Sequence, residues 1–94
     1  MAASDSYIIR TTGVLEPVVP ANKRDFKLEE VQKICNDCVE VVWDDREYCM
    51  IASENAIEKG FELNPIASFL ATEIVMYPMP ILGDVLVCKS NMFK

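Results

Sequence analysis

Short runs of alternating apolar and polar residues predict strands in both halves of the chain. Tyr7–Thr12 and Val14–Val19 are rich in residues that favour strands, and Gly13 between them predicts a hairpin. The second run contains Pro17, which has no amide hydrogen to donate. We therefore expect that run to lie at a sheet edge or to be irregular.

The strongest hairpin signal lies in the middle of the chain, where Cys38–Trp43 and Glu47–Ser53 flank a polar turn. In a strand, successive side chains point to opposite faces. The first arm is then apolar on both faces, with Val39, Val41 and Trp43 on one and Cys38 and Val42 on the other. Both faces of this strand are expected to need a covering partner.

Two segments carry apolar residues at the spacing of an amphipathic helix. The first helix is predicted over Leu28–Asn36, with Glu29 and Glu30 in its first turn, where the helix dipole favours negative charge. Its apolar face is predicted to consist of Leu28, Val31, Ile34 and Cys35.

The second helix has a clear start and stop in the sequence. Asn64 can cap it through its side-chain oxygen, and Pro65 suits the first helical position because no partner is needed for that amide. Pro78 prevents the helix from continuing. Its apolar face is predicted to consist of Ile66, Phe69, Leu70 and Ile74. A turn then leads into Val85–Cys88, an apolar run typical of a covered strand.

These elements follow the order β-β-α-β-β-α-β, and no repeat, linker or low-complexity tract interrupts them. We therefore predict a single α+β domain over residues 1–94, with residues 1–5 frayed. The sheet is expected to be mostly antiparallel, with both helices packed on one face. The other face would expose β-branched side chains, so we also expect a homodimer.

The chain is acidic, with a formal net charge of −6 and a sequence pI near 4.5. A negative surface repels phosphate backbones, so direct nucleic-acid binding is not expected. The sequence has no secretory signal pattern and no apolar run long enough to span a membrane, which predicts residence in the cytoplasm. Hydrophobic residues make up 51% of the chain, more than a small domain can bury, which predicts an apolar surface for a protein partner.

Four segments of the chain carry a resemblance to a known family. They are YIIRTTGVLEPVVP, DFKLEEVQKI, the hairpin VEVVWDD…MIASEN, and LNPIASFLA…ILGDVLVC. In their order and spacing they resemble a family of small domains of unknown function that is common in bacteriophages, plasmids and mobile elements. The resemblance implies an origin in a mobile element, a role outside housekeeping and, for a phage-encoded chain, residence in the host cytoplasm. It supplies no catalytic residues.

Cys35 and Cys38 have the spacing of a metal-binding or redox pair. A closed zinc site needs four ligands, but the chain has no histidine, and Cys49 and Cys88 are distant in sequence. Folding could still gather all four cysteines, so a metal site and a redox pair stay open as alternatives. We favour reduced, buried cysteines and expect no metal and no cofactor.

The absence of histidine also removes the commonest general base near neutral pH. Asp44 and Asp45 could form a carboxylate pair, but turn chemistry explains both residues in a hairpin. The glycines do not form a phosphate-binding loop. We therefore expect a protein without enzymatic activity.

Core packing explains most of the aromatic and methionine residues of the chain. A contact surface explains some of them, because aromatic residues and methionine are enriched in the cores of protein interfaces. The segment Met76–Pro80 is the best candidate contact, because a proline-stiffened loop loses little entropy on binding. The candidate binding residues are Trp43, Met76, Tyr77, Met79, Arg10 and Arg46.

Two functions are compatible with these features. We expect a non-enzymatic accessory protein of a phage or mobile element that binds and modulates a host protein, such as a defence component. The alternative is a small-molecule binder that sequesters a nucleotide-derived signal. For that function Arg10, Arg46 or Lys89 would have to converge across an oligomer interface to meet phosphate groups.

Overall fold

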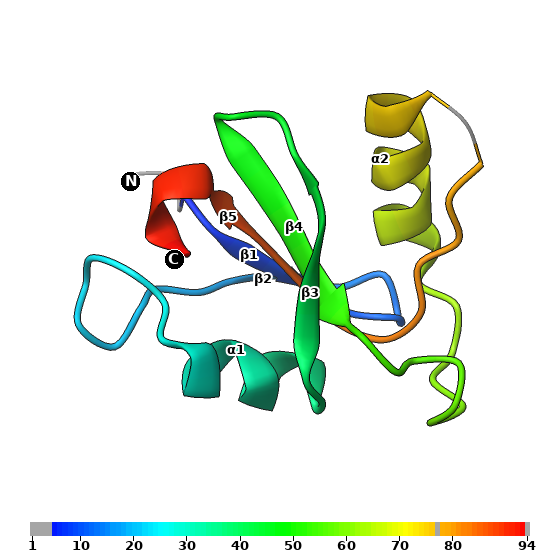
Figure 1. Cartoon of the computed structure of the whole chain (residues 1–94), viewed down its shortest axis with the longest axis horizontal. Coiled ribbons are helices and arrows are strands. Elements are labelled where there is room, and N and C mark those ends of the chain that lie inside the picture. The colour runs from blue at the N-terminus through cyan, green and yellow to red at the C-terminus, as the bar shows by residue number, and fades with distance from the viewer. Residues whose placement is uncertain (1–4, 77, 94) are drawn as a thin grey trace.

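The computed structural model describes residues 5–76 and 78–93, which form one five-stranded sheet and two α-helices (Figure 1). In chain order the elements are β1 (Tyr7–Ile9), β2 (Leu15–Pro17), α1 (Leu28–Cys35), β3 (Val39–Asp44), β4 (Tyr48–Ser53), α2 (Pro65–Val75), β5 (Val85–Lys89) and a short 3-10 helix, η1 (Ser90–Met92). This order confirms the predicted α+β fold with β-β-α-β-β-α-β succession.

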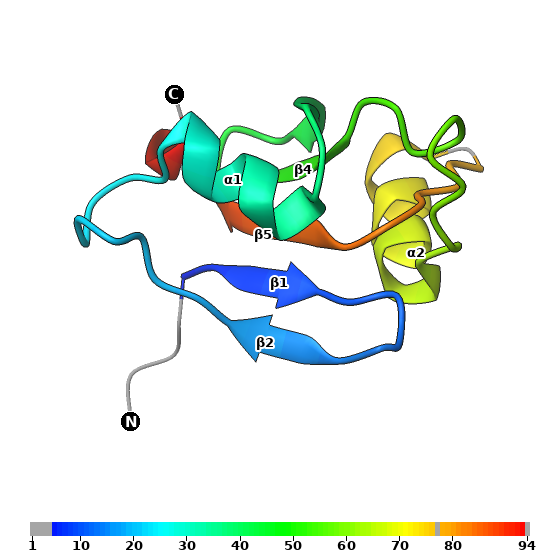
Figure 2. The same ribbon diagram turned by 90° about the horizontal axis from the view of Figure 1, so that it is seen from below.

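The sheet is antiparallel throughout, and its strand order is β2-β1-β5-β4-β3. The last strand in sequence therefore lies in the centre, between the two hairpins β1–β2 and β3–β4 (Figure 2). β2 forms one edge, as expected for a run that contains Pro17, and β3 forms the other. No helix among the described residues has the length and apolar character needed to cross a membrane.

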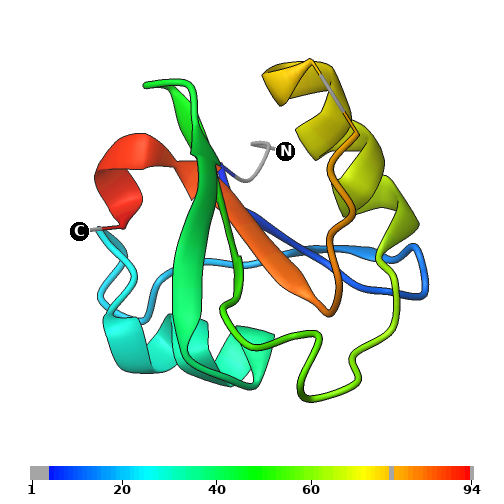
Figure 3. The ribbon, with the colours of Figure 1, turned by 45° about the vertical axis from the view of Figure 1, so that its right-hand side comes forward.

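The two helices cover opposite faces of the sheet, so the prediction that both pack on one face is wrong. On β4 and β5, Met50 and Val85 point into a core shared with α2, whereas Ile51 and Leu86 point into a core shared with α1. Figure 3 shows β5 running between the two helices. These central strands are apolar on both sides, so each face needs its own cover. The homodimer stays a prediction, although among the described residues each face of the sheet is covered by one helix.

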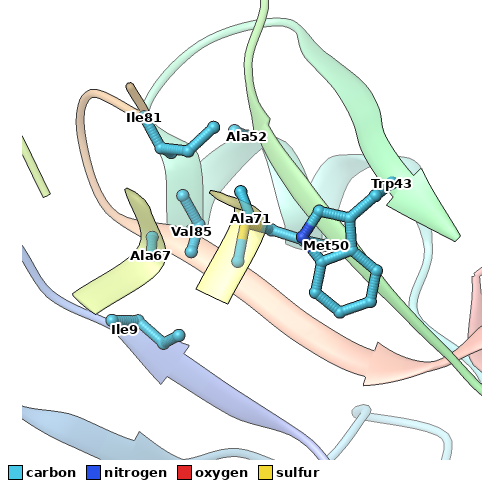
Figure 4. Packing of buried hydrophobic residues seen from close by; sticks show 8 residues of the cluster. All are labelled: Ile9, Trp43, Met50, Ala52, Ala67, Ala71, Ile81 and Val85. Carbon is cyan, nitrogen blue, oxygen red and sulfur yellow. The ribbon is translucent and has the colours of Figure 1, made fainter. Parts of the chain in front are cut away.

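The core on the α2 side depends on two alanines. Ala67 and Ala71 have no exposed surface and face Met50 and Val85 (Figure 4). Small side chains at these positions let the helix backbone approach the sheet closely. The predicted apolar face of this helix is divided: Ile66 and Leu70 pack against the core, whereas Phe69 and Ile74 are exposed.

The core on the α1 side contains Val31 and Cys35, which are buried, while Leu28 is exposed. The helix has no capping Ser or Thr. Instead, the Glu30 side chain accepts a hydrogen bond from the backbone N–H of Lys27 at 3.0 Å. The helix ends as predicted at Asn36, which adopts the left-handed conformation with φ of 59°.

A β-bulge at Val42 changes the faces predicted for β3. Val41 pairs with Ile51 and Trp43 pairs with Met50, so Val42 is the extra residue between two consecutive pairs. Val41 therefore shares the α1 side with Ile51, and Trp43 shares the α2 side with Met50. The prediction that Val41 and Trp43 occupy one face is wrong. Strict alternation assumes a regular strand, and one inserted residue moves the residues after it to the other face.

Candidate binding surface

In the predicted contact segment Met76–Pro80, Met76 ends α2 and Met79 lies against that helix. The backbone N–H of Met79 donates to the Thr72 hydroxyl at 3.1 Å, and the N–H of Ile81 donates to the Ser68 hydroxyl at 2.8 Å. Ser68 and Thr72 are four residues apart and therefore lie on one side of the helix. Met76 is 86% exposed, and Tyr77 lies outside the described residues.

On one side of this segment lies a hollow of about 560 Å³, which we call the proline hollow. It is lined by Leu63, Pro65, Ser68, Phe69, Thr72, Pro78, Met79 and Pro80. Phe69 is 64% exposed and Leu63 is 51% exposed, although both are large apolar residues. This surface therefore presents apolar side chains to solvent on a stiff support.

On the other side of Met79 and Pro80 lies a second hollow of about 390 Å³, which we call the acidic hollow. Its lining includes Val42, Ala52, Ile57, Met79, Pro80, Ile81 and three glutamates, Glu40, Glu54 and Glu58. Met79 and Pro80 line both hollows and form the ridge between them. Ile57, at 80% exposure, extends the apolar surface beyond the ridge.

Trp43 does not belong to this surface. It is only 8% exposed and packs in the core on the α2 side with Met50 and Ala71. Its indole Nε1 is buried and has no hydrogen-bond partner among the described residues. Trp43 is therefore a core residue and does not contribute to a binding surface.

Arg10 and Arg46 are not brought together within the chain. Arg10 pairs at 2.9 Å with Asp84, the residue before β5, and at 3.2 Å with Glu16. The hydrogen bond to Asp84 is the main cause that raises the pKa of Arg10 above its ordinary value. Arg46 lies in the turn between β3 and β4. The carbonyl oxygen of the next residue, Glu47, accepts a hydrogen bond from the backbone N–H of Ser90, which follows β5. Arg10 and Arg46 therefore lie near opposite ends of β5.

The four cysteines are free thiols. Cys35 is buried, its Sγ lies 3.6 Å from the carbonyl oxygen of Ile51, and burial raises its pKa to about 12. Cys38 is exposed, whereas Cys49 and Cys88 face each other in a core with 3.8 Å between their sulfurs. Within residues 5–76 and 78–93, no three Cys, Asp or Glu side chains are grouped so that they could hold a metal ion. The chemistry of the C-x-x-C pair stays a prediction.

Asp44 and Asp45 organise the turn between β3 and β4. Asp44 accepts from the N–H of Arg46 at 2.8 Å and from the Ser90 hydroxyl at 2.6 Å. The hydroxyl is the main cause that lowers the pKa of Asp44. Asp45 accepts from the N–H groups of Glu47 and Tyr48 at 3.0 and 2.8 Å. Both carboxylates thus have structural partners, as turn chemistry predicted.

Several residues of this surface were missed in the sequence. Phe69 fits the apolar spacing of its helix, and only the pair of alanines at 67 and 71 indicates that the buried face lies elsewhere. The three glutamates of the acidic hollow come from β3 and from the loop after β4. No local pattern connects them, so their proximity is a product of the tertiary fold.

Comparison with known proteins does not assign the chain to a family. No protein-family model matches it, and searches of curated proteins and of solved structures return no similar protein. The resemblance to the domains of phages and mobile elements therefore stays an expectation.

Proposed function

We propose that this chain is a non-enzymatic protein-binding module. The observation that carries the proposal is the exposed apolar surface around the ridge of Met79 and Pro80. Phe69 lines the proline hollow and is mostly exposed, and Met76, at the end of the same helix, is also mostly exposed. Exposed apolar surfaces of this kind mark protein contacts. In keeping with the resemblance, we propose an accessory protein of a phage or mobile element that binds and modulates a host protein, such as a defence component.

The rigidity of the surface supports this function. Two prolines constrain the segment beside α2, and the Thr72 and Ser68 hydroxyls fix its backbone. A surface already ordered before binding loses less conformational entropy when a partner docks. The acidic net charge adds selectivity for a partner with a basic surface.

The test compares two pairs of substitutions that each remove exposed apolar surface. Phe69→Ser with Met76→Ser changes the proposed contact, and Val14→Ser with Val19→Ser changes exposed apolar residues on either side of β2. Each tagged protein is used to capture proteins from a bacterial lysate, followed by quantitative mass spectrometry and a titration with the purified partner.

We expect one protein to be captured by the wild type and by the Val14/Val19 variant. The Phe69/Met76 variant should bind it at least about tenfold more weakly, since truncation of central apolar contacts costs more than about 1 kcal/mol each. Equal capture by all three proteins would contradict the proposal. Light scattering of the purified chain identifies the remaining case. A mass of twice 10.6 kDa for the wild type that falls to 10.6 kDa in the Phe69/Met76 variant would assign the surface to a second copy.

A further inference from the structure

β3 is an edge strand with unused backbone groups. The N–H of Glu54 donates to the carbonyl of Cys38 at 2.9 Å, which makes Val39 and Ser53 a non-hydrogen-bonded pair. The N–H and C=O groups of Val39 and Val41 therefore point away from β4. In the described part of the chain no strand lies on that side, as Figure 1 shows.

The opposite edge of the sheet is protected in a way that β3 is not. β2 has only three residues, one of which is Pro17, and its Glu16 is engaged by Arg10. β3 has six residues and contains neither proline nor lysine. The bulge at Val42 limits the regular part of this edge to Val39–Val41.

The acidic hollow lies beside this free edge. Glu40 and Val42 of β3 line it, together with Ala52 of β4 and the glutamates at 54 and 58. None of the three glutamates forms an ion pair within residues 5–76 and 78–93. No lysine or arginine lines the hollow, and the neighbouring Lys59 is held by Asp37 at 3.0 Å.

We propose that β3 and the acidic hollow together bind an extended segment of a partner protein that carries arginine or lysine. The segment adds a strand along Val39–Val41 through backbone hydrogen bonds. One of its side chains enters the hollow, where an aliphatic stem covers Val42 and Ala52 and the cationic group meets the glutamates. This inference rests on the proposed function and names the chemistry of its partner.

Charge decides between the occupants of this edge. A second copy of this chain carries the same net charge of −6, and its β3 would bring another Glu40 to the edge. A basic strand instead pairs with carboxylates that have no cationic partner among the described residues. The edge of β3 is already ordered and can act as a template. A flexible segment of the partner would lose conformational entropy on pairing with it and gain main-chain hydrogen bonds in return, as in other cases of strand addition.

The first test uses short peptides selected from a random display library against the wild-type protein. Binding of the best peptide is then measured for a triple variant, Glu40→Gln, Glu54→Gln and Glu58→Gln. The matched control is Glu29→Gln, Glu47→Gln and Glu73→Gln, which has the same net charge and changes exposed glutamates elsewhere. A third variant, Val41→Pro, removes an outward N–H without removing a hydrogen bond of the sheet.

We expect selected peptides to contain arginine or lysine flanked by β-branched residues. The triple variant and Val41→Pro should each bind about tenfold more weakly than the control, and added salt should weaken binding to the wild type. Amide hydrogen exchange at Val39 and Val41 should slow in the complex. Selection of peptides without cationic residues, or equal affinity of the triple variant and its control, would overturn the inference.

The captured natural partner separates this inference from the proposed function. If the partner loses affinity for the Phe69/Met76 variant but not for the triple glutamine variant, the protein-binding function stands and the strand-addition site is refuted. If neither set of substitutions weakens the partner, both proposals fail.

Discussion

Asn64 is a fully buried polar residue at the point where three segments meet. Its side-chain oxygen accepts from the N–H of Ala67 at 3.1 Å and caps α2. Its amide nitrogen donates to the carbonyl oxygens of Ile9 and Gly83, each at 2.9 Å. One side chain thus joins the start of α2 to the end of β1 and to the chain entering β5.

Replacement of Asn64 should destabilise the protein strongly. Asn64→Ala removes the cap and the side-chain donor to two carbonyls in the core, so we expect a loss of about 3 kcal/mol in the free energy of unfolding. The single tryptophan, Trp43, provides a fluorescence signal for unfolding in urea. Asn64→Asp keeps the capping oxygen and loses the donor. If that variant were as stable as the wild type, capping alone would explain the residue.

Asp37 allows a second test at a single residue, in which the free energy of unfolding is measured as a function of pH. It accepts from the Ser53 hydroxyl at 2.6 Å and from the N–H of Asn55 at 3.0 Å, and its other oxygen pairs with Lys59. The Ser53 hydroxyl is the main cause that lowers its pKa well below the ordinary value of 3.8. The folded state therefore keeps this carboxylate ionised at a pH where the unfolded chain takes up a proton.

The stability contributed by Asp37 is present above its unfolded pKa of 3.8 and is lost as the pH falls toward its lower folded pKa. We expect the free energy of unfolding to fall with pH in this range less steeply in Asp37→Asn than in the wild type. Glu58→Gln, which changes an exposed carboxyl group, is the control. Parallel pH profiles for Asp37→Asn and the wild type would rule out this role.

At the scale of elements, the contact between α2 and the sheet depends on close packing. Ala67 and Ala71 are completely buried, and their facing partners include Met50 and Val85. We expect Ala71→Leu to lower the free energy of unfolding by about 1–3 kcal/mol, because extra volume forces the helix away from the sheet. Ala21→Leu, in an exposed loop, should have little effect. Urea unfolding measures both, and unchanged stability of Ala71→Leu would show that this contact is loose.

Elements with local signals could be predicted from the sequence. The start of α2 is marked by Asn64 and Pro65, its end by the nearby Pro78, and the end of α1 by Asn36. In each case neighbouring residues decide the backbone conformation. The start of α1 is different, because the side chain at the cap position, Lys27, makes no capping hydrogen bond. The Glu30 carboxylate instead accepts from the backbone N–H of Lys27 and holds the first turn.

Features that depend on distant residues could not be predicted in the same way. The bulge at Val42 is defined only by its pairing with β4, and it changes the face of Trp43. The apolar run from Val85 to Cys88 indicates that both faces of the central strand need cover, but which helix covers which face depends on contacts between distant elements. The two hollows combine residues from separate elements and have no sequence signature.

For the whole molecule, the two cores predict how its thiols react. Cys38 is exposed, whereas the other three cysteines are at most 2% exposed. We expect one thiol per native chain to react rapidly with a thiol-specific reagent and the other three to react only on unfolding. Cys38→Ser should abolish the rapid phase. Rapid reaction of more than one thiol in the native protein would contradict the packing of the two faces.

We propose that the chain binds a partner protein through the surface around Met79 and Pro80. Hydrogen exchange of the backbone amides, compared with and without the captured partner, tests it most directly. We predict slower exchange in residues 39–42, 54–58 and 63–80, and unchanged exchange in the hairpin formed by β1 and β2. Protection of that hairpin, with none around Met79 and Pro80, would contradict the account.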